Sequence, residues 1–244
     1  MNIAKREPHV AVISTDRPNN VPRIKHVLQC EPTFYVTKGE EKFYQKCGAL
    51  HVVGCDRNIS AARNRAMNDA AEMGRYGVQV SDDLKGIEIA MDRHRKVKAT
   101  FAEVCEMIFK KMREEEVTLA GVAITGNLFY YTGTPWVTDK LVVNDMIFTI
   151  GNDIQYDEKA ALKEDYDMFV MQMMKNGKVL RANHILCNFP HRGNAGGANV
   201  YRTKLEEQLR NEYVMKKHKG IIVPHKSRLN QVEINYKLLK ERMA

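Results

Sequence analysis

Two adjacent carboxylates follow a short apolar segment and are the first candidates for chemistry in this sequence. Residues 77–80 have the composition of a buried strand, and Asp82 and Asp83 follow one residue after it. Ligands of open α/β sheets bind beyond the carboxyl ends of the strands. Paired carboxylates at such a place either hold a hard cation or act as acid and base.

A predicted helix with basic side chains precedes that strand. It begins at Asn58 or Ser60 and ends at Gly74. Arg63 is close enough to its start to face the strand ends, and Arg65 follows on the same helix. Basic groups beside an acidic pair predict a phosphate that a metal ion bridges to the protein.

A second group of carboxylates lies early in a predicted helix at residues 160–175. Glu164, Asp165 and Asp167 stand within one turn of each other. Negative charge at this position complements the helix dipole, which is a purely structural role. Neighbouring carboxylates also raise each other's pKa, which suits a general base at the mouth of a cleft. Both interpretations are open.

A glycine-rich segment at residues 188–202 has the composition of a phosphate-binding loop. His191 stands just before the glycines, and Arg192 and Arg202 bracket them. Backbone N–H groups and arginines suit a pyrophosphate, and an imidazole suits a metal ion. The alternative is an ordinary surface loop.

Strands and helices alternate regularly before this point, which predicts a parallel sheet with helices on its faces. The first strand, residues 9–15, leads into a loop that offers Ser14, Thr15, Asp16 and Arg17 to a ligand. The alternative is a turn that binds no ligand. Neither a GxGxxG nor a GxxxxGK pattern is present, so a bound nucleotide must be held in another way. In this first half we predict strands at 33–36, 51–55 and 77–80 and helices at 22–28, 39–49 and 58–74.

The second half is predicted to continue the α/β pattern and to end in helices. A basic, polar segment at 86–99 is either a solvated surface or a contact for a phosphate backbone. Aromatic residues between 128 and 136 either fill the core or stack on a sugar or a base. Here we predict a helix at 99–117, strands at 119–127, 140–144, 145–150 and 178–185, and tail helices at 203–219 and 228–243.

Composition narrows the class of protein. The 244 residues suit one α/β domain with an extension, and the net charge of +8 favours a polyanionic partner without naming it. The five cysteines form no CxxC pair, so a zinc ribbon or a disulfide framework is not expected. No apolar segment is long enough for a membrane span. We therefore expect a cytoplasmic protein that binds no membrane.

The order of these motifs resembles the glycosyltransferases of the A-type fold. More narrowly, VISTDRPNNVPRI, SAARNRAM, VQVSDDLK and KEDYDMF resemble the TET-associated glycosyltransferases of bacteriophages. The resemblance covers residues 10–202 and implies an α/β fold with a mostly parallel central sheet flanked by helices, to which this chain adds a helical C-terminal extension at 203–244. It also implies a nucleotide-binding part at 9–86 and an acceptor part at 87–202. Such enzymes transfer a sugar from a UDP-sugar to 5-hydroxymethylcytosine in double-stranded DNA.

The resemblance also implies roles for single residues. The nucleotide-sugar would contact Ser14, Thr15, Arg17, Arg63, Asp82 and Arg192. Asp83 and His191 would hold Mn²⁺ or Mg²⁺. Asp165, with Glu164 beside it, would be the base if the reaction inverts the anomeric centre. The usual acidic motif is Asp-x-Asp, whereas this chain has Ser81 before Asp82 and Asp83. Either Asp82 binds the ribose or sugar and Asp83 the metal ion, or the metal site is weaker than in the wider class.

Two other functions fit the same residues. One is a glycosyltransferase of the same fold whose acceptor is a carbohydrate or a protein. The other is a non-catalytic DNA-binding accessory protein that retains a degenerate sugar-nucleotide site. The first predicts transfer without DNA, and the second predicts salt-sensitive DNA binding without turnover.

Overall fold

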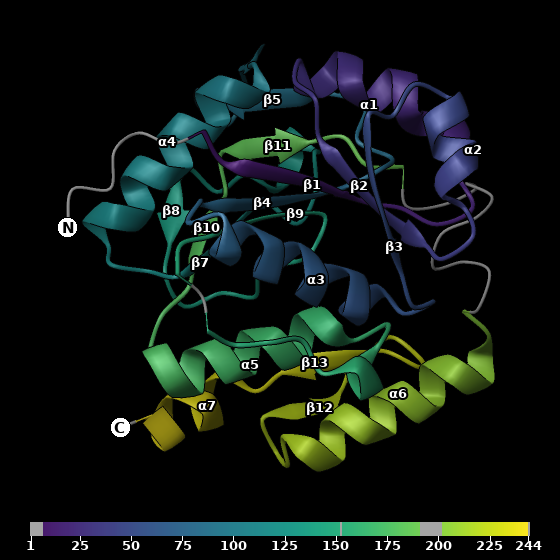
Figure 1. The fold of residues 1–244 in the computed structure, drawn as a ribbon. Coiled ribbons are helices and arrows are strands. Elements are labelled where there is room, and N and C mark those ends of the chain that lie inside the picture. Colours follow the sequence, from purple (N-terminus) through teal and green to yellow (C-terminus); the bar gives the residue numbers. More distant parts are fainter. Residues whose placement is uncertain (1–6, 152, 191–201, 244) are drawn as a thin grey trace.

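The fold is a mixed α/β structure built on an eight-stranded sheet (Figure 1). The computed structural model describes residues 7–151, 153–190 and 202–243. The sheet order is β3-β2-β1-β4-β9-β7-β10-β8. Its strands are β1 (His9–Ile13), β2 (Thr33–Thr37), β3 (His51–Cys55), β4 (Gly77–Ser81), β7 (Leu119–Val122), β8 (Trp136–Val137), β9 (Met146–Thr149) and β10 (Leu180–Ala182).

Most strands of this sheet run in one direction, as predicted. Strands β1 to β4 are parallel neighbours, and β7 is parallel to β10. Strand β9 lies between β4 and β7 and is antiparallel to both, and β8 is antiparallel to β10 at the edge. The chain order reverses between β1 and β4, which is the topological switch point of a doubly wound sheet.

Side chains alternate across the strands and give the sheet two apolar faces. Val12 and Phe34 pack with α1 (Val21–Leu28), α2 (Glu41–Lys46) and α4 (Phe101–Glu114) on one face. On the other face, Ala11 and Ile13 pack with α3 (Ile59–Glu72), and Ile147 packs with α5 (Glu164–Asn176). The predicted helix at 99–117 is confirmed as α4, and its apolar residues at helical spacing are all buried in the core: Phe101, Val104, Cys105, Ile108 and Met112.

Local sequence signals explain where the main helices begin and end. The Asn58 side chain accepts a hydrogen bond of 2.8 Å from the Ser60 N–H and begins α3. Thr100 and Glu103 form a capping box at the start of α4. Helix α5 ends at Gly177, whose φ of 75° is the left-handed conformation that glycine adopts at little cost.

Several predicted elements in the second half were wrong. Residues 140–144 form no strand, and the segment at 178–185 is two strands, β10 and β11 (Ile185–Cys187). The basic segment at 86–99, for which we predicted no strand, contains β5 (Ile87–Ala90) and β6 (Lys96–Lys98), which form a small antiparallel sheet with β11. Helix α5 begins four residues later than predicted, because residues 158–160 form a separate 3-10 turn, η3 (Glu158–Ala160).

The C-terminal extension is only partly helical. It contains α6 (Lys204–Lys217), a hairpin of β12 (Ile222–Pro224) and β13 (Val232–Ile234), and α7 (Tyr236–Met243). The predicted helix at 228–243 was therefore wrong in its first half, where Val232 and Ile234 alternate with polar residues as strand residues do. The extension packs on the outer side of α5 (Figure 1) and shares an apolar cluster with it that includes Val214, Ile222, Leu239 and Phe169.

Candidate functional site

A cavity of about 450 Å³ opens at the carboxyl ends of β1 and β4. Its walls come from the loop after β1, the turn after β4, the start of α3, the segment before β9 and the first turn of α5. The predicted site residues that line it are Ser14, Thr15, Arg17, Arg63, Asp82, Asp83, Glu164 and Asp165. Predicted residues His191 and Arg192 lie outside the described residues.

Asp82 is the centre of a hydrogen-bonded network on the floor of this cavity. It is buried and accepts a short hydrogen bond from the Ser14 hydroxyl, and Arg17 Nη1 donates to its Oδ1 at 3.0 Å. The Ser14 hydroxyl also lies 2.6 Å from the Tyr44 hydroxyl. Burial raises the pKa of Asp82, and the bonds from Ser14 and Arg17 act in the opposite direction. Asp82 thereby fixes the loop after β1, because it holds both Ser14 and Arg17.

Asp83 stands beside this network and lines the cavity with a carboxylate that fits a hard cation. Its Oδ1 accepts a hydrogen bond of 2.9 Å from Ser81, and its Oδ2 lies 3.7 Å from Arg17 Nη1. Arg23 donates to the backbone carbonyls of Asp82 and Asp83 at 3.1 and 3.2 Å, which fixes the turn. Within the described ranges, no group of three or more His, Cys, Asp or Glu side chains is placed to hold a metal ion. The predicted pair is Asp83 with His191, so this observation does not test it.

Arg63 reaches the cavity wall from α3 but is 3% exposed. Its guanidinium donates to Gln79 Oε1 at 3.2 Å and to the Asn144 carbonyl at 2.9 Å. Its Nε has no hydrogen-bond partner among the described residues and lies 4.0 Å from Glu164 Oε1. Arg63 therefore brings a buried positive charge to the start of α5. The neighbouring Arg65 points away and pairs with Asp69 at 2.7 Å on the same helix.

Glu164 and Asp165 lie in the first turn of α5 and line the cavity. Burial, and after it the charge of Glu164, raise the pKa of Asp165 to about 7. The Tyr166 N–H donates to Asp165 Oδ1 at 2.9 Å and opposes this change. A carboxyl group that titrates near neutral pH can accept a proton from a bound hydroxyl.

Two further cavity residues, Asn144 and Asp145, were not predicted. They immediately precede β9, and the Ser81 N–H donates to the Asp145 carbonyl at 2.8 Å. The prediction followed the carboxyl ends of parallel strands, whereas β9 is antiparallel and brings its amino end to the cavity. The charge of Asp145 contributes to the raised pKa of Asp165. The polar residues just before a strand are the signal that would have found them.

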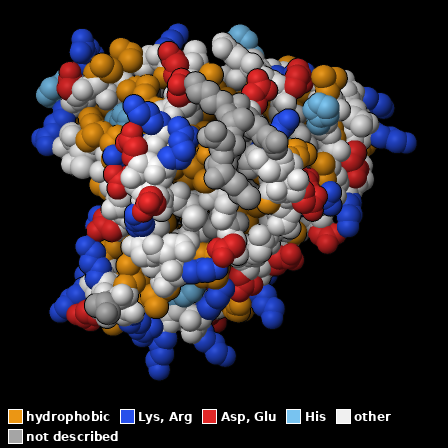
Figure 2. All heavy atoms as spheres, turned by 60° about the vertical axis from the view of Figure 1, so that its left-hand side comes forward, with side chains coloured by type: hydrophobic (Ala, Val, Ile, Leu, Met, Phe, Trp, Pro, Cys, Tyr) orange, Lys and Arg blue, Asp and Glu red, His pale blue; other side chains and the backbone are white. Residues whose placement is uncertain are grey.

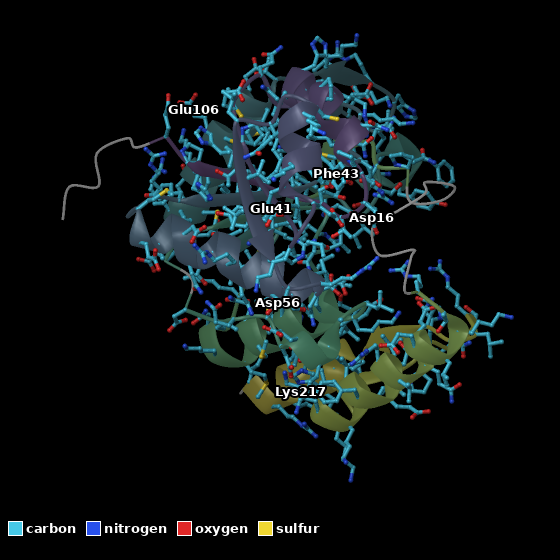
Figure 3. The ribbon with its side chains drawn as sticks, turned by 45° about the vertical axis from the view of Figure 1, so that its right-hand side comes forward. Asp16, Glu41, Phe43, Asp56, Glu106 and Lys217 are labelled. Carbon is cyan, nitrogen blue, oxygen red and sulfur yellow. The ribbon has the colours of Figure 1, made fainter. Side chains whose placement is uncertain are left out.

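The charged side chains of the cavity include more acids than bases. Among its described lining residues, the carboxylates are Asp56, Asp82, Asp83, Asp145, Glu164 and Asp165, and the guanidinium groups are Arg17, Arg57, Arg63 and Arg202. One of these basic groups is already paired, because Arg57 lies 3.0 Å from Asp16; Asp16 and Asp56 are labelled in Figure 3. A diphosphate would therefore need an added cation to balance these acids.

The third predicted carboxylate, Asp167, points away from the cavity. It is fully buried, accepts a hydrogen bond of 2.6 Å from His218 Nε2, and lies 2.8 Å from Lys217 Nζ. Lys217 also pairs with Asp157 at 2.8 Å, and the Tyr213 hydroxyl donates to Asp157 at 2.7 Å. Figure 3 shows Lys217 in the layer that α5 and α6 form together.

Two further contacts join α6 to the segment of residues 157–167. Arg210 donates to the Lys159 carbonyl at 3.0 Å, and the buried Lys163 pairs with Glu207 at 3.2 Å. All these partners lie within residues 157–167, the stretch that contains Glu164 and Asp165. The first helix of the extension thus supports the wall of the cavity.

No protein-family model matches the sequence, and no curated protein is similar enough to give a match. Within the described part of the chain, no helix has both the length and the apolar character needed to cross a membrane.

Proposed function

We propose that this protein is a metal-dependent glycosyltransferase that moves a sugar from a UDP-sugar to the hydroxymethyl group of 5-hydroxymethylcytosine in DNA. One observation carries the proposal most directly. Motifs from three distant parts of the chain, after β1, after β4 and at the start of α5, bring their predicted residues to the walls of one cavity. That cavity lies at the switch point of the sheet, where doubly wound folds bind nucleotides.

The donor would lie along the strand ends. Ser14, Thr15 and Arg17 would contact the nucleotide, because the loop that contains them follows β1 at the switch point. Asp82 holds Ser14 and Arg17 in place for this contact. Asp83, with the predicted ligand His191, would hold Mn²⁺ or Mg²⁺, whose charge would offset the excess of carboxylates and the charge of the diphosphate.

Asp165 would be the base. As the hydroxymethyl oxygen forms a bond to the anomeric carbon, the bond from that carbon to the diphosphate oxygen breaks and UDP leaves. The hydroxyl proton passes to Asp165, whose raised pKa of about 7 matches such a transfer near neutral pH. This assignment supposes inversion of the anomeric centre. Arg63, whose Nε lies 4.0 Å from Glu164 Oε1, would bring a positive charge beside this pair of carboxyl groups.

The acceptor assignment depends on the resemblance and on the net charge of +8. A duplex presents the 5-position of cytosine in the major groove, so the hydroxymethyl group is reachable there or after base flipping. The test is UDP release from a panel of UDP-sugars with Mn²⁺, in the presence of otherwise identical DNA containing cytosine or 5-hydroxymethylcytosine.

We expect UDP release to rise only with the hydroxymethylated DNA. Release that is equally fast with both DNAs, or with none, would reject the DNA acceptor and favour a carbohydrate or protein acceptor. DNA binding with no UDP release from any donor would favour the non-catalytic alternative.

A further inference from the structure

Two aromatic rings are exposed on a short helical turn near the cavity. Phe129 and Tyr130 belong to η2 (Leu128–Tyr130) and are 84% and 66% exposed. Their rings meet edge to face, with centroids 5.3 Å apart. Exposed rings of this size are costly in water, and an adjacent pair of them indicates a surface that binds a partner.

The turn that bears these rings is held in place from both sides. The Asn127 side chain accepts a hydrogen bond of 3.0 Å from the Phe129 N–H and begins the turn. Tyr131, the next residue, is buried against Ala90 and Leu186 of the small sheet. The exposed rings are therefore presented by a fixed support, because their neighbours in sequence belong to the core.

A basic hairpin lies beside the aromatic turn. Residues 91–98, which join and include β6, are all exposed, and four of them are Lys or Arg. Arg93 joins the two features, because its guanidinium donates to the Thr132 carbonyl at 3.0 and 2.5 Å. Two acids partly offset the charge: Lys96 pairs with Glu88 at 2.6 Å, and Arg95 Nε lies 3.7 Å from Asp92.

The same region borders the candidate active site. A second cavity, of about 160 Å³, is lined by Tyr130, Tyr131, Asn127, Asn183 and Arg181. Ile124 lines this cavity and the larger one, so the two are neighbours. Tyrosine rings with amide and guanidinium groups suit a flat heterocycle that has hydrogen-bonding edges.

On the face that Figure 2 shows, Lys and Arg side chains are interspersed with Asp and Glu. The net charge of the chain alone therefore does not select a docking surface. A docking surface is indicated instead by the exposed rings and the basic hairpin, which adjoin each other beside the cavity.

We propose that Phe129, Tyr130 and the 91–98 hairpin, here called the aromatic-basic surface, bind the acceptor DNA strand. Bases stack on the two rings, the hairpin contacts the phosphates, and the second cavity receives the base that bears the hydroxymethyl group. This inference rests on the proposed function. It adds the residues that bind the acceptor and commits to DNA rather than to a protein or a glycan.

The test is binding of a short fluorescent oligonucleotide that contains one 5-hydroxymethylcytosine, measured by anisotropy over a range of salt without UDP-sugar. The double variant Phe129→Ala with Tyr130→Ala should lose about 5- to 150-fold in affinity for each base stack removed. Its affinity should keep the salt dependence of the wild type, because stacking is largely independent of salt. The double variant Arg95→Ala with Lys98→Ala should lower the slope of log K against log salt by about 0.7 to 0.9 for each phosphate contact removed.

Matched controls on α2 separate a local effect from a general one. Phe43 is an exposed ring, 57% accessible, and is labelled in Figure 3. Phe43→Ala, and the double variant Lys42→Ala with Lys46→Ala, should bind DNA as the wild type does.

The outcomes separate this proposal from the proposed function. Wild-type DNA affinity in the aromatic variant, or no DNA binding by the wild type, would overturn the aromatic-basic surface even if transfer occurred. Reduced DNA binding in both surface variants, with no UDP release from any donor, would support the surface and reject the enzyme. Unchanged donor hydrolysis with reduced transfer to DNA would support both.

Discussion

Replacing Asp165 by asparagine should stabilise the protein while it removes activity. In the folded state, burial and the charge of Glu164 raise the pKa of this carboxyl from 3.8 to about 7. Between these values the folded protein holds a proton that the unfolded chain has lost. The wild type therefore becomes less stable as the pH rises from about 4 to about 7, whereas an uncharged asparagine has no such dependence.

The magnitude follows from the size of this pKa difference. One pKa unit corresponds to about 1.4 kcal/mol, so the change from 3.8 to about 7 would amount to about 4 kcal/mol in a closed interior. Asp165 is only half-buried and faces the cavity, so solvent screens part of this penalty. We expect Asp165→Asn to raise the free energy of unfolding by about 2 kcal/mol at about pH 8 and to leave it unchanged at about pH 4.

Urea unfolding of the wild type and the variant at both pH values measures this directly. Asp153→Asn is the matched control, because Asp153 is an exposed carboxylate whose pKa Lys175 lowers, so its loss should not stabilise the protein at high pH. Sugar transfer by Asp165→Asn should fall about 10²- to 10⁴-fold, and wild-type transfer should rise with pH around 7. Equal stability of variant and wild type at about pH 8 would refute the argument that Asp165 is strained by its burial.

Three further predictions concern the metal, the extension and a helix start. Asp83→Asn should raise the Mn²⁺ concentration for half-maximal transfer about tenfold or more, and an unchanged Mn²⁺ titration would remove it as a ligand. Lys217→Met leaves the buried Asp167 with fewer partners, so it should lower the free energy of unfolding in urea by about 1–3 kcal/mol. It should also lower kcat more than it raises KM. A loss of stability with unchanged kcat would show that α6 does not support the cavity wall that contains Asp165. Thr100→Ala removes the capping box with Glu103 and should cost about 1 kcal/mol in urea unfolding, with transfer unchanged; no loss of stability would contradict the capping role.

The first half of the fold was predictable because each of its units repeats the same local pattern. Strands β1 to β4 are apolar segments that end in Ser or Thr or are followed directly by Ser or Asp, and the Asn58 cap begins the helix that precedes β4. Parallel neighbours place all carboxyl ends at one edge, so Ser14 and Asp82 could be predicted to meet from local signals alone.

The second half was less predictable because its strands depend on distant partners. Strand β9 inserts between β4 and β7 in the opposite direction, and this pairing brought the unpredicted Asp145 to the cavity. Strands β5 and β6 lie in a polar segment and pair with each other, and β5 also pairs with β11, about a hundred residues later in the chain. Short strands with few apolar residues give a weak periodic signal, so tertiary pairing decides their structure.

Dependence on distant partners also explains why the different roles of Asp165 and Asp167 could not be predicted. Asp165 and Asp167 are two residues apart on one helix, and spacing alone grouped them. Their side chains point to different neighbours: Asp165 lines the cavity, and Asp167 binds His218 and Lys217 of α6. Only the packing of the extension on α5 separates their roles.

The most direct test of the central proposal is the mass of the modified nucleoside. DNA that contains either cytosine or 5-hydroxymethylcytosine is incubated with the protein, Mn²⁺ and UDP-sugars, then digested to nucleosides and analysed by mass spectrometry. We predict a hexose or N-acetylhexosamine mass on hydroxymethylcytosine alone, present with the wild type and lost with Asp165→Asn. An unchanged hydroxymethylcytosine mass with every donor, while UDP is still released, would contradict the DNA acceptor.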